Sequence, residues 1–130
     1  MKTRLYFFWL MPLVVFIFCW GSCLKKSDPG PAANVYPKSV SFTYKITGIS
    51  TNRADVLSYK TASGADSTVA GAALPYSVLF NRVVNKNDVL SVGYGTHSNQ
   101  SVKLEIFVDN KLVKSEQFNA TAGAIVYLFE

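Results

Sequence analysis

Strict alternation of apolar and polar residues is the feature of this chain that most constrains its fold. In the stretch SVSFTYKIT, residues 39–47, the apolar side chains of Val40, Phe42, Tyr44 and Ile46 occupy every second position. Successive side chains of a β-strand point to opposite faces of a sheet, so this period places all four on one face. The stretch therefore predicts a strand with one buried face and one solvated face.

Seven further segments have a similar strand-like pattern, and turn residues separate them. They cover residues 54–61, 66–72, 75–84, 88–95, 101–108, 111–119 and 124–130. Pro75 should open its strand or lie at a sheet edge, because proline has no N–H to donate to a ladder. Seven or eight short strands, with no long amphipathic helix, predict an all-β fold: an immunoglobulin-like antiparallel β-sandwich over residues 38–130.

Two short motifs indicate how this sandwich is connected. Asp109 and Asn110 both tolerate positive φ, and they separate two apolar runs, which predicts a two-residue hairpin turn. The stretch Gly93-Tyr94-Gly95 is not followed by a helix whose N-terminal amides could bind phosphate, so its glycines are more typical of a bulge in a strand.

The N-terminus has the pattern of an export signal. A basic MKTR precedes sixteen uncharged residues, and the small residues Gly21 and Ser22 come just before Cys23. This arrangement resembles the bacterial lipobox, in which the cysteine thiol receives a diacylglycerol and the chain is cut before it. We therefore expect a lipoprotein signal peptide over 1–22, lipidation of Cys23, and a membrane anchor made of several acyl chains.

A second interpretation of the N-terminus remains open. Residues 5–24 are twenty uncharged residues, which is long enough for a retained transmembrane helix. In either case the region 23–37 is rich in proline and has no periodicity, which is typical of a flexible tether. Both interpretations place the body outside the cytoplasm, in the periplasm or at the cell surface of a bacterial envelope.

The charge pattern argues against a nucleic-acid partner. The chain carries a net charge of +5, but four of its thirteen basic residues flank the apolar leader. The remaining nine are spread among acidic and polar neighbours. Binding to phosphates requires clustered basic groups. We therefore expect no nucleic acid among the partners.

Catalytic side chains are too few for a recognisable active site. His97 is the single histidine, and it lies in the polar stretch THSNQ, where a solvated loop residue is expected. No pair of carboxylates is placed as an acid and base couple, and no thiol follows Cys23. We expect no enzymatic activity, no catalytic residues, no cofactor and no metal site.

The C-terminal strands carry apolar residues on both of their faces. Four aromatic residues should lie opposite the aliphatic ones of the same strands: Phe107, Phe118, Tyr127 and Phe129. A strand that is apolar on both faces is either covered within the core or part of a contact surface. Both alternatives stay open, and the second makes these four residues a candidate partner surface.

Four motifs in one order, SFTYKITG, DVLSYKTASG, ALPYSV and SVKLEIFVDNKLV, resemble the mycobacterial membrane protein small (MmpS) family over residues 40–128. The resemblance implies a small non-enzymatic accessory beside a transporter of the resistance-nodulation-division (RND) type. We thus expect a lipid-tethered interaction domain that assists such an exporter. The alternative is a surface lipoprotein whose aromatic side chains bind a glycan or another extracellular ligand.

Overall fold

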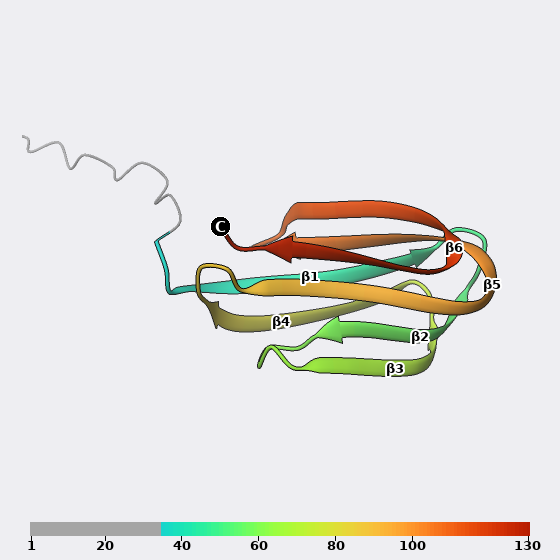
Figure 1. Cartoon of the computed structure of the whole chain (residues 1–130), viewed down its shortest axis with the longest axis horizontal. Coiled ribbons are helices and arrows are strands. Elements are labelled where there is room, and N and C mark those ends of the chain that lie inside the picture. Colours follow the sequence, from blue (N-terminus) through green and yellow to red (C-terminus); the bar gives the residue numbers. More distant parts are fainter. Residues whose placement is uncertain (1–34) are drawn as a thin grey trace, which may run out of the picture. The chain divides into compact units, whose positions relative to one another are not determined.

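Antiparallel β-strands and short turns make up residues 35–130, the part of the chain that the computed structural model describes (Figure 1). The strands are β1 (Lys38–Gly48), β2 (Arg53–Lys60), β3 (Asp66–Ala73), β4 (Tyr76–Val84), β5 (Val89–Val108) and β6 (Lys111–Leu128). This range has no helix, and so none that is long and apolar enough to cross a membrane. The expected all-β, antiparallel character is confirmed.

The strands are fewer and longer than expected, because two pairs of segments are continuous. Segments 88–95 and 101–108 both belong to β5, and segments 111–119 and 124–130 both belong to β6. The polar stretch around His97, expected as a turn, lies within β5. The ladder between β5 and β6 shifts register between Gly95 and Gln100, so the hairpin bends there. A bulge was expected at these glycines, and the shift follows directly after them.

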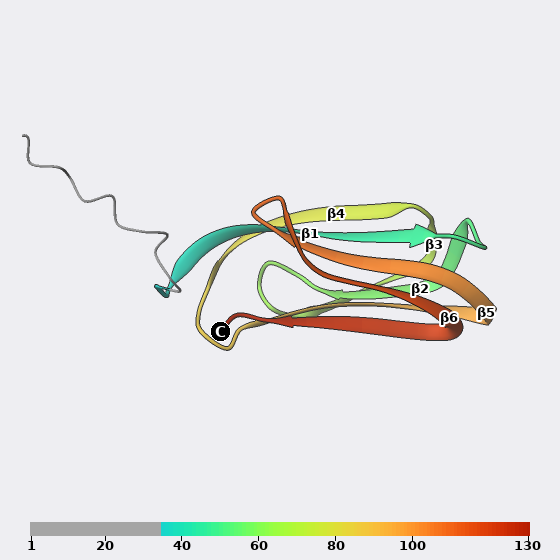
Figure 2. The same cartoon turned by 90° about the horizontal axis from the view of Figure 1, so that it is seen from above.

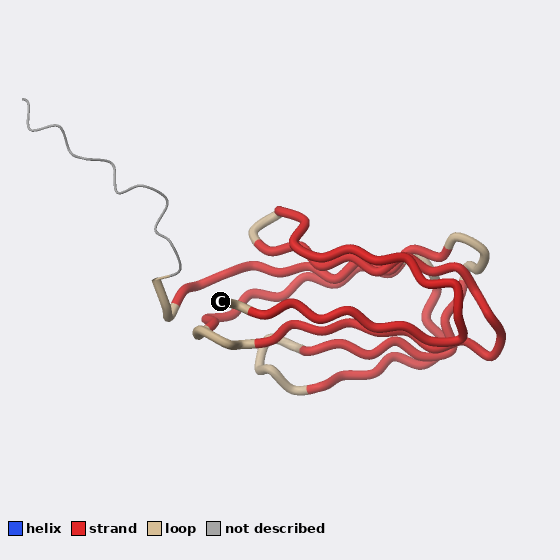
Figure 3. Tube along the Cα trace, turned by 45° about the horizontal axis from the view of Figure 1, so that its top comes forward, coloured by secondary structure: helices blue, strands red, loops and turns tan. Residues whose placement is uncertain are grey.

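All six strands form one sheet, in which the strand order is β3-β2-β5-β1-β4 and β6 pairs with β5. The first half of β5 pairs with β2, and its second half pairs with β1. We call β4, β1, the second half of β5 and the first half of β6 the β4 arm. The β3 arm consists of β3, β2 and the other halves of β5 and β6. Since β5 and β6 run through both arms, the sheet is curled (Figures 2 and 3).

The core lies between the two arms. The alternating residues of β1 are all buried, with Val40, Phe42, Tyr44 and Ile46 each at most 3% exposed. Tyr44 of the β4 arm meets Tyr59 of the β3 arm, with 5.8 Å between ring centroids. The strand and the buried face expected from the SVSFTYKIT pattern are thus confirmed.

The expected hairpin turn and the expected position of Pro75 at a strand start are both present. Asp109 and Asn110 have φ angles of 49° and 63°, and they join β5 to β6 as a two-residue turn. This turn is attached to β1, since the backbone N–H of Ser41 donates a hydrogen bond to Asp109 Oδ1 over 2.9 Å. Pro75 directly precedes β4, which is an edge strand.

Candidate binding surfaces

The expected anchoring site falls outside the described residues. Cys23, the signal peptide 1–22 and the alternative transmembrane span all precede residue 35, as does most of the tether 23–37. Their assignments stay predictions. The last tether residues are described, and there the ring of Tyr36 packs edge-on against Phe129, with 6.5 Å between centroids.

The four aromatic residues of the candidate partner surface do not gather on one face. Phe129 is only 1% exposed and belongs to the core, where its ring meets Tyr127 at 5.1 Å. Phe129 is therefore removed from the candidate surface. The strand is apolar on both faces as expected, but its exposed apolar residues are Val126 and Leu128. Tyr127 is half-buried and packs on the core.

The other two aromatic residues lie at separate places. Phe118 packs beside Tyr94, with 6.2 Å between centroids, and it covers Gly123 so closely that a Cβ there would lie 2.5 Å from the ring. Its role is structural. Phe107 points away from the core, since its register partner is Thr43 on the polar face of β1. Of the four aromatic residues, Phe107 is the one that lies on the outer face of the β4 arm.

Phe107 belongs to a row of residues that crosses the outer face of the β4 arm. Register pairs connect Leu79 of β4 to Thr43, Thr43 to Phe107, and Phe107 to Leu112 of β6. Leu79 is 58% exposed and Leu112 is 52% exposed. We call these four residues the outer row. Neither Leu79 nor Leu112 was expected on a contact surface, although Leu79 occupies a polar-phase position of its strand, where an apolar side chain indicates an exposed residue.

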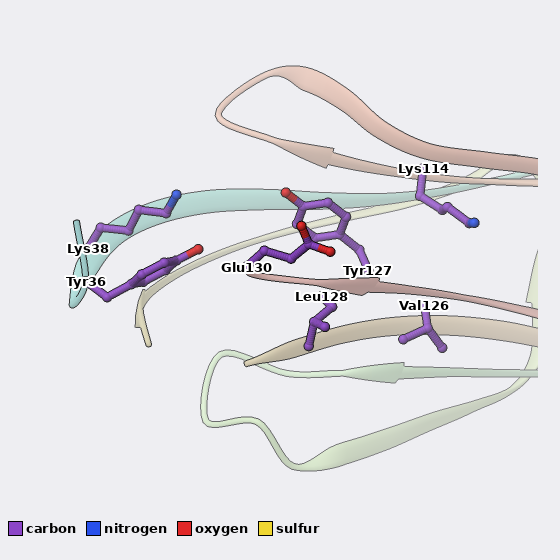
Figure 4. A pocket seen from close by; sticks show the side chains of 7 residues that line it. All are labelled: Tyr36, Lys38, Lys114, Val126, Tyr127, Leu128 and Glu130. Atoms are coloured by element: carbon purple, nitrogen blue, oxygen red, sulfur yellow. The ribbon is translucent and has the colours of Figure 1, made fainter. Parts of the chain in front are cut away.

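A groove lies where β1 begins and β6 ends, and it has a volume of about 420 Å³. Figure 4 shows Lys114 and Tyr127 projecting toward it from the two halves of β6, while Val126 and Leu128 project to the other side of their strand. The residues that line it are Tyr36, Lys38, Lys114, Val126, Tyr127, Leu128 and Glu130. Two phenol rings and three charged side chains could bind a polar ligand that also offers an apolar face.

Lys38 is held at this groove by aromatic rings. Its ammonium nitrogen lies 4.9 Å from the ring centroid of Tyr36 and 5.6 Å from that of Phe129. A cation over a ring face is attracted by the negative charge of the π-system. The groove therefore carries a positioned positive charge at the end of the domain where the N-terminal tether joins it.

His97 is solvated, as expected, but it has a partner that the sequence did not reveal. Its side chain is 89% exposed, and its Nδ1 contacts the side-chain carboxylate of Asp55 on β2. The backbone N–H of His97 donates to the same carboxylate oxygen of Asp55 over 2.6 Å. These hydrogen bonds lower the pKa of Asp55 below its ordinary value. Within residues 35–130, no serine or threonine hydroxyl is hydrogen-bonded to this imidazole.

The phenols between the arms are shifted toward their protonated form. The hydroxyl oxygens of Tyr59 and Tyr76 lie 3.2 Å apart, and this hydrogen bond raises the pKa of Tyr76 to about 12. Burial raises the pKa of Tyr44, whose hydroxyl has no hydrogen-bond partner of good geometry.

Across residues 35–130, no group of three or more histidine, cysteine, aspartate or glutamate side chains could hold a metal ion.

No protein-family model matches the chain, and no curated protein matches it significantly. The resemblance to the MmpS family thus rests on the four sequence motifs alone.

Proposed function

We propose that the chain is a lipoprotein of the bacterial envelope, tethered through Cys23, whose β-domain is a non-enzymatic interaction module. In this proposal the two arms act as the layers of an immunoglobulin-like sandwich. The contact between Tyr44 and Tyr59 across the arms supports that description. The membrane lies at the N-terminal end of the tether, and the body works by contact with a neighbour.

The observation that carries the proposal is the outer row. Scattered exposed apolar residues are ordinary, but a connected set that crosses several strands of one face marks an interaction surface. Leu79, Phe107 and Leu112 form such a set on a face whose other side chains are mostly polar or charged, with Val83 as a further exposed apolar residue. The MmpS resemblance supports an RND-type exporter as the neighbour.

Site-specific crosslinking in native membranes tests this function. A photoreactive amino acid at Leu112 should give adducts with a membrane transporter, and the same group at Val126 should not, although Val126 is equally exposed at 54%. The substitution Leu112→Glu should weaken co-purification of that transporter, whereas Val126→Glu should not. If Leu112 captured no membrane protein, the exporter partnership would be refuted.

The anchor is tested separately. Cys23→Ala should abolish labelling by a fatty-acid probe and leave an unprocessed precursor, because both acylation and cleavage need the thiol. Normal processing of this variant would instead identify an ordinary signal peptide. Labelling of neither form, with the leader retained, would support the transmembrane alternative.

A second function is favoured by the groove. Tyr36 and Tyr127 offer rings on which a sugar could stack, and Lys38, Lys114 and Glu130 offer hydrogen-bond groups around them. This arrangement suits a glycan or another extracellular ligand. Tyr127→Ala should then reduce glycan retention on an array at least tenfold, and Leu112→Glu should leave it unchanged. Resistance of the body to protease on intact cells would argue against surface display and therefore against this function.

A further inference from the structure

Strand β4 ends the β4 arm with an open edge. Its backbone pairs with β1 on one side, and none of the described residues hydrogen-bonds to it on the other. Figure 2 shows β4 along the upper margin of the sheet. An edge strand exposes unpaired N–H and C=O groups and can accept a further strand.

The other two edge strands of this sheet carry features that discourage pairing. β3 contains Asp66 at one end and Gly71, whose positive φ of 62° interrupts the pairing with β2. β6 has exposed Lys111, Lys114 and Glu116 along its first half. Its second half borders the groove that holds Lys38 and Lys114. Charges and irregular backbone positions of this kind discourage pairing at an edge.

β4 has neither kind of protection. Its nine residues, YSVLFNRVV, contain no proline, and the ladder with β1 is unbroken from Ile46 to Lys38. Arg82 is its single charged residue, and the guanidinium is neutralised by Asp88 at 2.8 Å with only 15% of the side chain exposed. A strand approaching this edge therefore meets no free charge.

We propose that β4 pairs with β4 of a second copy, antiparallel and across a twofold axis at Phe80. This register uses the whole strand. It sets Leu79 of each copy beside Asn81 of the other, and Ser77 beside Val83. Each Arg82 then lies opposite Val78, and the two guanidinium-bearing positions are about 13 Å apart along the strands. The inference goes beyond the proposed function, because it needs no other protein.

A second copy also explains why β4 leaves so much apolar surface open. On its outer side Leu79 and Val83 are 58% and 59% exposed. On its inner side Tyr76, Val78 and Phe80 pack on the core and are only partly buried. In the paired form Leu79 is diagonal to both Leu79 and Val83 of the other copy, which is within reach of aliphatic contact. The pairing thereby covers residues of both faces at once.

The pairing can be tested by photo-crosslinking the full-length chain in the membranes of cells that express it. A photoreactive amino acid at Asn81 should give an adduct of twice the mass of the chain, since Asn81 lies beside Leu79 of the second copy. The same group at Val126, an exposed residue of the β3 arm, should give less than a tenth of that adduct. Adding Leu79→Lys should reduce the Asn81 adduct at least tenfold, because the two lysines would approach each other at the axis. The matched Val126→Lys should leave it unchanged.

A folding defect is separated from a pairing defect by a second edge variant and a second measurement. Ser77→Lys alters only a solvent-exposed polar residue of β4, and it should also suppress the adduct while leaving the circular dichroism spectrum unchanged. Wild type extracted in mild detergent should sediment as a dimer, and Ser77→Lys as a monomer. A monomeric wild type, an equal adduct at Val126, or Asn81 adducts made only with other proteins would each overturn the proposal.

Discussion

The two arms of the sheet meet in two regions that are built in opposite ways. The aromatic seam consists of Phe42, Tyr44, Tyr59, Tyr76 and Phe80, and its ring centroids lie 5.5 to 6.4 Å apart. The glycine bend consists of Gly93 and Gly95 of β5 and Gly123 of β6, close to the register shift. At the seam, large side chains fill the space between the arms. At the bend, the glycines have no side chain, so neighbouring atoms can approach the backbone closely.

The difference between the seam and the bend shows how a single curled sheet can cover its own inner face. At the seam, separate strands face each other and large rings fill the distance between them. At the bend, β5 and β6 continue from one arm into the other, and neighbouring side chains press against bare backbone. A Cβ on Gly95 would lie 2.9 Å from Val56, and one on Gly123 would lie 2.5 Å from Phe118. The seam should therefore be sensitive to smaller residues and the bend to larger ones.

Phe42→Ala should cause the largest effect. Phe42 is 1% exposed and its ring lies 5.5 Å from both Tyr44 and Phe80, so its loss leaves a cavity between the arms. We expect the free energy of unfolding to fall by about 3–5 kcal/mol, measured by denaturant unfolding of the detergent-solubilised chain. Phe107→Ala on the outer face is the matched control, and it should cost clearly less. Equal losses for the two variants would contradict the description of the seam.

Gly123→Ala should come next, because the added methyl group would overlap the ring of Phe118. Overpacking of this kind costs about 1–3 kcal/mol. The same change in a Phe118→Ala background should cost much less, since the clash is absent. An unchanged cost in that background would mean that the methyl group meets something other than Phe118.

Removing single hydroxyl groups should distinguish the two regions more finely. At the bend, the Tyr94 hydroxyl donates to the carbonyl oxygen of Ala120 over 2.9 Å, so Tyr94→Phe should lower stability by about 1 kcal/mol. In the seam, the buried Tyr44 hydroxyl has no hydrogen-bond partner of good geometry. Tyr44→Phe should thus be neutral or stabilising, by up to about 1 kcal/mol. Paired thermal unfolding experiments measure both, and a reversed order would refute the assignment of these two hydroxyls.

The smallest effect concerns pH at the bend. The hydrogen bonds from His97 lower the pKa of Asp55 below its ordinary value of 3.8. The folded state then favours the carboxylate, so this contribution is present above pH 3.8 and is lost as the pH falls through the lowered pKa. His97→Ala should raise the titration midpoint of the Asp55 carboxyl toward 3.8, observed by carbon NMR. An unchanged midpoint in this variant would contradict the contact between His97 and Asp55.

Local patterns in the sequence were sufficient for part of the site. The outward position of Phe107 was expected, because it follows from its phase relative to Ile106 on the same strand. For Phe129 the sequence left burial in the core and exposure on a contact surface both open, and the structure shows burial, with Tyr36 from the other end of the described range packed against it. The pairing of Asp55 with His97 was missed because 42 residues separate them and no local signal connects them.

Period-two alternation and the turn residues by themselves determined that residues 38–130 fold as antiparallel strands, which face is buried, and where Asp109 and Asn110 reverse the chain. These are local properties, fixed by where successive side chains point and by which residues accept positive φ. That β5 and β6 each continue through both arms, and that β4 lies uncovered at the sheet edge, is visible only in the three-dimensional structure. Those features depend on which strands pair, and pairing joins residues that lie far apart in the sequence.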